Sequence, residues 1–322
     1  VCEATKRILN ESKIEASKIT AVGISYQMHG LVVVDSDGEP LKNAIIWCDS
    51  RAVEIGNKAF QDLSPERCTK TLLNSPANFT ASKLKWVKDN EPELFAKIHK
   101  FMLPGDFIAF KLTDEISTTK NGLSEGIFWD YESDTIADWL LDYFGFDSEL
   151  VPKLVENFSP QGYITNKASL ETGLPEGIPV TYRAGDQPNN ALSLNVFNDG
   201  EVAATGGTSG VIYAVTNNKN SKEPSRINHF AHVNYSTDNQ SIGKLLCING
   251  AGIMYRWLRN QSSAESYETM NRKASKVPIG SDGLVILPFG NGAERMLNNL
   301  NVGTQFCNIN LNQHDKAHLF RA

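Results

Sequence analysis

The sequence lacks long hydrophobic runs and paired cysteine motifs. Its apolar runs at residues 31–34 and 284–287 have the length of strands and fall far below the roughly 20 residues that span a bilayer. The five cysteines are scattered and show no C-x-x-C spacing, which is typical of free thiols in a reducing compartment. These absences predict a cytoplasmic protein without a membrane partner.

The sequence also lacks an excess of basic residues. Its 322 residues include 31 Lys and Arg against 37 Asp and Glu, which gives a formal net charge of −6. Proteins that bind nucleic acid usually carry a basic excess, so we expect no nucleic-acid partner. The hydrophobic share of 41% is ordinary for a globular protein, and the length predicts two domains.

Strand-like and helix-like segments alternate along the chain. Residues 19–25, 31–34, 41–47 and 180–182 predict strands, and a helix is expected from about residue 187 to 194. Residues 201–205 and 211–215 predict two more strands, joined by a glycine-rich loop. The alternation favours an α/β fold with mixed sheets, with a domain boundary near residue 190.

A single carboxylate and a glycine-rich loop are the strongest candidates for chemistry. Asp186 lies between a predicted strand and a predicted helix, where it can accept a proton from a hydroxyl or hold Mg²⁺; the alternative is a helix N-cap. Gly206-Gly207-Thr208-Ser209-Gly210 lies between two predicted strands, where glycine amides can cradle a phosphate; the alternative is a turn without a ligand. Together they predict a base and a phosphate cradle in one cleft.

Polar residues also follow the first predicted strand. Gln27, Met28 and His29 come directly after it, and side chains at the carboxyl end of a strand can face a ligand. The alternative is a buried histidine with satisfied hydrogen bonds. His229 and His232 are three residues apart without a cysteine nearby, which favours a structural role over a metal site. Residues 47–51 predict a polar cluster at a strand end, and a contact between Asp49 and Arg51 within the segment is an equally good interpretation.

Several segments, taken in order, resemble motifs of the FGGY carbohydrate kinases, and within that family those of its D-xylulose kinases. The similarity covers nearly the whole chain, and the order and spacing of the segments are more specific than any one motif. The matching segments are residues 23–30 (GISYQMHG), 44–51 (AIIWCDSR), 79–87 (FTASKLKWV), 184–186 (AGD) and 207–210 (GTSG).

This resemblance implies a two-domain, actin-like ATPase fold of the ribonuclease H-like type, truncated at both ends. The domain at 1–190 would bind the sugar and lack its first strands, and an incomplete domain at 191–322 would bind the nucleotide. The family's N-terminal Asp-x-Gly-Thr hairpin and C-terminal Gly-Gly-Gly segment have no counterpart in the sequence. We therefore expect that the chain is a central part of a longer protein.

The resemblance also implies roles for individual residues. Asp186 would be the base and would contact Mg²⁺, and ATP would be the phosphoryl donor. The sugar contacts would be Gln27, Met28, His29 and Gln187. The residues expected to line the ATP phosphates are Gly207, Thr208, Ser209 and, near the nucleotide, Gly252.

The implied activity is ATP-dependent phosphorylation of D-xylulose at its terminal hydroxyl, which gives xylulose 5-phosphate. Three alternatives stay open. The protein can be a kinase for another sugar or polyol, such as ribulose or gluconate, a non-catalytic sugar-binding relative, or an actin-like ATPase with a protein partner. The expected ligands are a ketose and ATP, and the resemblance leaves a homodimer open.

Overall fold

The structure is a computed structural model that describes residues 1–220, 222–263, 266–297 and 300–322. Its contacts divide the chain into two compact units. Unit 1 comprises Val1–Glu201, Ala214–Pro224 and His229–Gly243, and unit 2 comprises Val202–Tyr213, Ser225–Asn228 and Lys244–Ala322. The predicted domains, 1–190 and 191–322, have a single boundary, whereas this division is discontinuous.

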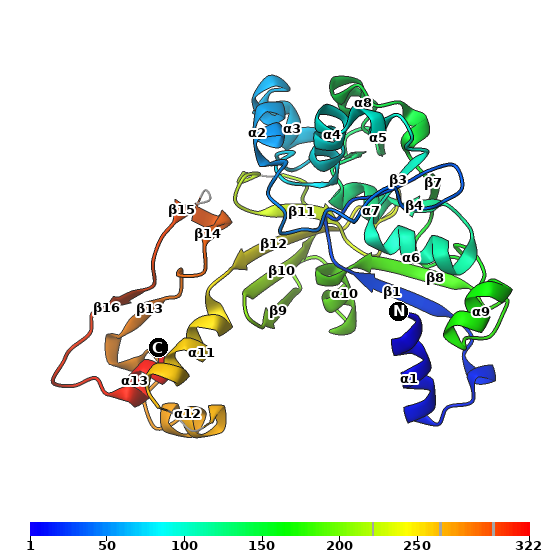
Figure 1. Cartoon of the computed structure of the whole chain (residues 1–322). Helices are drawn as coiled ribbons and strands as arrows, with labels where there is room; N and C mark the ends of the chain where they lie inside the picture. The colour runs from blue at the N-terminus through cyan, green and yellow to red at the C-terminus, as the bar shows by residue number, and fades with distance from the viewer. Residues whose placement is uncertain (221, 264–265, 298–299) are drawn as a thin grey trace. The chain divides into compact units, whose positions relative to one another are not determined.

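Unit 1 contains two parallel strands from distant parts of the sequence. Strand β1 (Val22–Tyr26) pairs with β8 (Val180–Gly185), and the two lie side by side in Figure 1. Along β1, buried Ile24 and Tyr26 alternate with exposed Gly23 and Ser25, as expected for a strand with one covered face. Helix α6 (Pro104–Thr113) packs against both strands.

Apolar residues of this pair pack in one cluster, with Ile24, Tyr26 and Val180 among its members. A separate and larger apolar core lies around α4 (Thr80–Asn90) and α7 (Lys120–Glu125). The other helices of unit 1 are α1 (Cys2–Ser12), α2 (Val53–Asp62), α3 (Pro65–Thr71), α5 (Pro92–Phe95), α8 (Asp138–Phe144), α9 (Asn166–Thr172), α10 (Asp186–Ser193) and the short 3₁₀ turns Ala16–Lys18 and Ser148–Leu150. Its other strands form the pairs β2 (Val32–Val34) with β3 (Lys100–Met102), β4 (Ser117–Thr119) with β7 (Lys153–Val155), and β5 (Trp129–Asp130) with β6 (Thr135–Ile136).

A four-stranded sheet has the order β11-β12-β10-β9. Its strands are β9 (Val202–Gly206), β10 (Gly210–Thr216), β11 (Asn228–Ala231) and β12 (Ile242–Ile248). Unit 2 also contains α11 (Ala251–Gln261), α12 (Tyr267–Ala274), α13 (Lys316–Arg321), the 3₁₀ turns Ser281–Gly283 and Arg295–Leu297, and the strand pairs β13 (Val285–Leu287) with β16 (Gln305–Cys307) and β14 (Ala293–Glu294) with β15 (Leu300–Asn301). The glycine-rich loop therefore connects β9 to β10, as the sequence predicts.

The prediction of a strand at residues 41–47 is wrong. This segment forms no strand: it makes an isolated antiparallel bridge between Ile45 and Leu31 and a further backbone hydrogen bond, from the Leu41 N–H to the Val33 oxygen at 3.0 Å. Ile45 is buried, but Ile46 and Trp47 are 40% and 60% exposed, so the apolar run has no second strand to cover it. The five cysteines all lie in the described residues and are free. Within the described ranges, we find no helix with the length and apolar character that a membrane span requires.

Candidate active site

The parallel pairing of β1 and β8 brings together two segments that are far apart in the sequence. In the register of this pair, Tyr26 lies opposite Gly185. Because parallel strands end at the same edge of a sheet, the residues that follow them share that edge. Gln27, Met28 and His29 therefore lie at the same strand ends as Asp186. The structure thus groups four of the residues that the sequence singles out.

A close approach at Gly185 joins these two strand ends. A Cβ atom at this position would lie 2.5 Å from Glu125 Oε2 and 3.1 Å from Met28 Sδ. Met28 is buried, at 5% exposed, whereas Gln27 is half-buried. A side chain larger than glycine at position 185 would therefore push Met28 and Glu125 away from the strand ends.

His29 has an unusual backbone and a well-defined environment. Its φ angle is 60°, in the left-handed region that few non-glycine residues adopt. Its ring nitrogen Nδ1 lies 3.0 Å from the backbone oxygen of Glu125. The ring also packs against Phe79 and Phe230, at centroid distances of 4.7 and 5.1 Å. His29 is thus half-buried and hydrogen-bonded, as the second alternative expects, and it also lies at a strand end; its contact with a ligand stays a prediction.

Asp186 is the first residue of α10 and is exposed. Gln187 Nε2 donates a hydrogen bond of 3.4 Å to its Oδ2 atom. Partial burial by surrounding residues removes water from the Asp186 carboxyl group and raises its pKa, although hydrogen bonds from Gln187 act in the opposite direction. A raised pKa increases the proton affinity of this carboxylate, as a general base requires.

A group of buried charges lies behind the strand ends. Asp106 and Arg183, 1% and 0% exposed, form an ion pair with Asp106 Oδ1 3.4 Å from Arg183 Nε. Glu125 is 2% exposed, and burial together with the charges of Asp106 and Asp186 raises its pKa well above the usual range. Burial also raises the pKa of Asp106, against the attraction of Arg183.

Sequence reasoning missed this group. Asp106 lies in the first turn of α6, where its Oδ2 accepts the Leu103 N–H at 3.2 Å. No local pattern reveals that Arg183, on a distant strand, is its partner. Glu125 lies at the end of α7 without a motif around it.

In unit 2, the start of α11 lies against the glycine-rich loop. Gly207, Thr208 and Gly252 line one pocket of about 340 Å³. The Ile253 N–H donates to the backbone oxygen of Thr208 at 3.0 Å. A Cβ atom at Gly252 would collide with the carbonyl oxygen of Gly207. The structure thus brings together three of the four residues predicted to contact the nucleotide within a single unit.

The fourth residue, Ser209, hydrogen-bonds to the Cys247 side chain. The same pocket is also lined by Tyr255, Arg256 and Tyr267, which the sequence analysis missed. Arg256 follows Gly252 by four positions, so helical spacing alone places both on one face. Tyr267 belongs to α12 and stacks on Tyr255 at 5.6 Å between ring centroids, and no sequence signal places it there.

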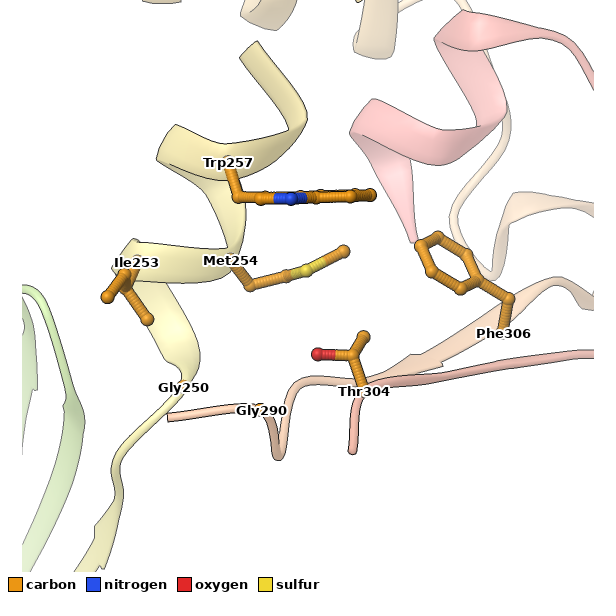
Figure 2. Close-up of a pocket in the computed structure, with 7 residues that line it drawn as sticks. All are labelled: Gly250, Ile253, Met254, Trp257, Gly290, Thr304 and Phe306. Carbon is orange, nitrogen blue, oxygen red and sulfur yellow. The ribbon is translucent and has the colours of Figure 1, made fainter. Parts of the chain in front are cut away.

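A second pocket of about 370 Å³ lies along another face of α11. Figure 2 shows Met254 and Trp257 reaching from the helix toward Thr304 and Phe306. Its lining is mainly apolar and includes no charged side chain, so it suits an apolar group better than a phosphate. Ile253 lines both pockets.

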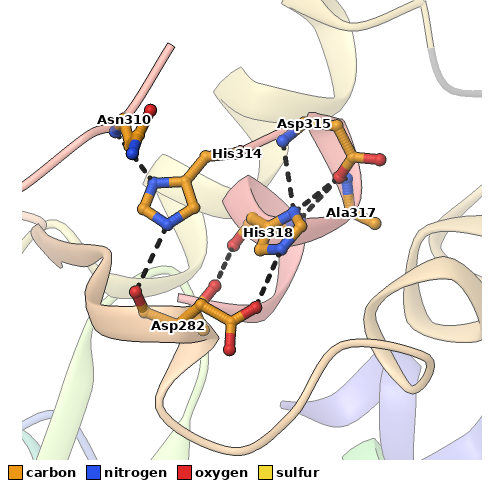
Figure 3. A network of polar contacts seen from close by, with 7 residues as sticks. Asp282, Asn310, His314, Asp315, Ala317 and His318 are labelled. Atoms are coloured by element: carbon orange, nitrogen blue, oxygen red, sulfur yellow. Dashed lines mark hydrogen bonds and ion pairs between the residues drawn. The ribbon is translucent and has the colours of Figure 1, made fainter. Parts of the chain in front are cut away.

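Polar contacts also fasten the last helix of unit 2. Figure 3 shows His318 between two carboxylates, with Nδ1 2.7 Å from Asp315 Oδ1 and Nε2 3.2 Å from Asp282 Oδ2. The hydrogen bond with Asp315 is the main cause of the raised pKa of His318. This network caps α13 and contributes nothing to the pocket at Gly252.

The histidines at 229 and 232 have structural partners. Asn74 Oδ1 accepts the backbone N–H of His229 at 2.9 Å, and the ring nitrogen Nε2 of His232 lies 3.0 Å from the backbone oxygen of Val196. Among the described residues, no three His, Cys, Asp or Glu side chains form a group that could hold a metal ion. Mg²⁺, however, usually binds one or two carboxylates together with substrate phosphates, so the exposed carboxylate of Asp186 fits that mode.

With this geometry established, comparison with known proteins identifies relatives. Residues 1–193 match the N-terminal domain of the FGGY family of carbohydrate kinases. The chain is 27% identical over 316 residues to a xylulose kinase of Staphylococcus xylosus, a match that covers 96% of the chain and 63% of the relative. Overall, the chain spans about three-fifths of the length of such curated relatives.

Solved structures show the same fold. A xylulose kinase from Rhodospirillum rubrum superposes with a TM-score of 0.84 at 24% identity, over 98% of this chain and 64% of that one. A gluconate kinase from Lactobacillus acidophilus gives a TM-score of 0.85 at 23% identity, over 99% and 64% of the two chains. The mixed α/β architecture expected from the sequence is thus confirmed.

Proposed function

Because the chain belongs to the FGGY family of carbohydrate kinases, we propose that the protein transfers the γ-phosphoryl group of ATP to the terminal hydroxyl of D-xylulose. The observation that carries this proposal is the meeting of the Met28-His29 turn and the Asp186 carboxylate at the ends of two parallel strands. The names of the relatives support the choice of sugar. The product would be xylulose 5-phosphate.

In this proposal, the residues of unit 1 bind and activate the sugar. Gln27, Met28, His29 and Gln187 contact the ketose, and Asp186 orients its terminal hydroxyl and accepts the proton that leaves it. The raised pKa of Asp186 supports this role. A general base of this kind typically contributes about 10²- to 10⁴-fold in rate.

The residues of unit 2 would bind the nucleotide. The backbone amide of Ser209 and the hydroxyl of Thr208 suit phosphate oxygens, whereas the Gly207 N–H donates to the Ser209 backbone oxygen at 2.9 Å and so fixes the shape of the loop. The Arg256 guanidinium in the same pocket adds positive charge. Gly252 allows the helix to approach the loop closely. Mg²⁺, which Asp186 would help to hold, neutralises phosphate charge when bound.

The cellular setting is also part of the proposal. We place the protein in the cytoplasm, with a ketose and ATP as its ligands. The five free cysteines support this location, because oxidising compartments favour disulfides.

A substitution at Asp186 tests the chemistry. Asp186→Asn keeps the shape but removes the base, so we expect turnover in a coupled ADP-release assay to fall by about 10²- to 10⁴-fold, with the melting temperature unchanged. Asp138→Asn is the matched control, because Asp138 is likewise the exposed first residue of a helix. Near-normal turnover of the Asp186→Asn variant would refute the assignment of the base.

A kinase for another sugar is the second candidate. It is favoured by the likeness of the fold to the gluconate kinase of Lactobacillus acidophilus. A panel of D-xylulose, ribulose and gluconate in the same assay separates the two, because the true substrate should show the highest kcat/KM.

A further inference from the structure

The first turn of α4 lies against the turn that carries the proposed sugar contacts. Thr80 Oγ1 donates to the Gly30 oxygen at 3.2 Å, and Lys83 Nζ donates to the His29 oxygen at 2.7 Å. Both side chains are 0% exposed. This helix belongs to the segment 79–87 singled out in the sequence, to which the proposed function assigns no role.

Glu125 holds the same peptide from another element. Its carboxylate accepts the backbone N–H of His29 and the hydroxyl of Tyr26. Its backbone oxygen lies 3.0 Å from His29 Nδ1. Since a carbonyl oxygen only accepts, Nδ1 carries the proton in this contact. Both polar groups of the His29 backbone, and its ring, thus bond to Lys83 or Glu125.

Holding His29 in this way costs free energy, both in the backbone of His29 and in the burial of Lys83. The left-handed backbone of His29 persists only where the surroundings enforce it. Burial lowers the pKa of Lys83 to about 8, although the charges of Asp49 and Cys48 act in the opposite direction. Burying an ammonium group costs free energy even when the group bonds to a carbonyl. The role of Lys83 is therefore to fix the position of the His29 peptide rather than to stabilise the fold.

We propose that Lys83 and Glu125 are positioning residues of the sugar site, which fix the His29 peptide between them and so orient Met28 and His29 toward the ketose. This inference deepens the proposed function and rests on it. Neither residue is expected to touch the sugar, because both side chains are buried behind the turn.

Lys83→Met tests the first half, because methionine fills the same buried space without a donor. We expect the Kd of D-xylulose, measured by calorimetry on the full chain, and the KM for D-xylulose to rise about 10- to 100-fold. The KM for ATP should not change, and the melting temperature should stay equal or rise. Unchanged sugar affinity, or a lower melting temperature as the only effect, would overturn the proposal.

Lys88→Met is the matched control on the same helix. Lys88 Nζ also donates to backbone oxygens, those of Phe144 and Gly145, but these lie away from the His29 turn. We expect sugar affinity to stay within about twofold of the wild type. A loss equal to that of Lys83→Met would show that any lysine removed from α4 has this effect, and it would refute the specific role of Lys83.

A pair of variants tests Glu125. Glu125→Gln keeps an acceptor for the His29 N–H and should retain sugar affinity within a few-fold, whereas Glu125→Leu should lose about 10- to 100-fold.

The ring nitrogens of His29 report on the orientation of this residue in the absence of any ligand. Their nitrogen-15 signals should show a protonated Nδ1 in the wild type and should shift in Lys83→Met and Glu125→Leu but not in Lys88→Met.

The two readouts separate this inference from the proposed function. If the wild type binds no ketose, the proposed function fails, while the signals of His29 still decide whether Lys83 and Glu125 hold it. If the wild type binds ketose but the His29 signals and the affinity are the same in all variants, the positioning role is wrong.

Discussion

The contact between α11 and the glycine-rich loop gives the sharpest prediction for the nucleotide pocket. A Cβ atom at Gly252 would collide with the backbone oxygen of Gly207. Neither group can rotate away, because both are backbone and the Ile253 N–H to Thr208 oxygen bond fastens them at 3.0 Å. The Cβ would lie 2.0 Å from the Gly207 oxygen, and an ordinary contact needs at least about 3.4 Å. Gly252→Ala must therefore separate the helix from the loop by more than about 1 Å.

A displacement of about 1 Å at groups that position a substrate typically reduces the rate by about 10²-fold. We therefore expect kcat/KM for ATP to fall about 100-fold in Gly252→Ala, equivalent to about 2.7 kcal/mol of transition-state stabilisation. The affinity for D-xylulose should not change, because the sugar residues belong to unit 1.

The assay is coupled ADP release with ATP varied at saturating D-xylulose, together with thermal unfolding of each variant. Gly303→Ala is the control, because a Cβ at Gly303 would have no atom within 4 Å and the residue lies outside the proposed nucleotide pocket. A folded Gly252→Ala variant with unchanged kcat/KM for ATP would refute the assignment of this pocket to the nucleotide.

Two further predictions concern stability. Asp106→Ala leaves the fully buried guanidinium of Arg183 without its ion-pair partner, so we expect urea unfolding to show a loss of about 3–5 kcal/mol; a double variant with Arg183→Met should recover part of it, and no recovery would argue against the pair. His232 has a pKa lowered to about 4, chiefly by burial, so the folded protein resists protonation that the unfolded chain accepts near its ordinary pKa of about 6.5. The stability from the neutral ring is therefore complete above about pH 6.5 and is lost as the pH falls toward 4. Between pH 7 and pH 5, His232 should account for a loss of about 2 kcal/mol, which His232→Phe should abolish; an equal loss in that variant would contradict this account.

Much of the candidate site could be predicted from local sequence. The β-branched run before Gln27 and the strand before Asp186 are both visible, and each polar residue follows its strand directly. Gly207 stands in the loop between two predicted strands, whereas Gly252 is singled out only through the family resemblance. These signals are local, because strand propensity and turn chemistry act over a few residues.

The strand predicted at residues 41–47 shows the limit of such reasoning. Its apolar residues look like those of a strand, yet only Ile45 makes a bridge. Strand formation depends on a partner of matching length, and the sequence of the segment does not contain that information.

The sequence by itself determined the alternation of strands and helices, the family resemblance, and the candidate residues at 27–29, 186 and 207–209. Only the tertiary structure decided that Tyr26 lies opposite Gly185, that Lys83 and Glu125 bond to His29, and that Asp106 is paired with Arg183. The physical reason is that buried polar groups must find partners wherever the fold brings them. The two partners of His29 lie 54 and 96 positions away from it along the chain, far beyond the reach of any local pattern.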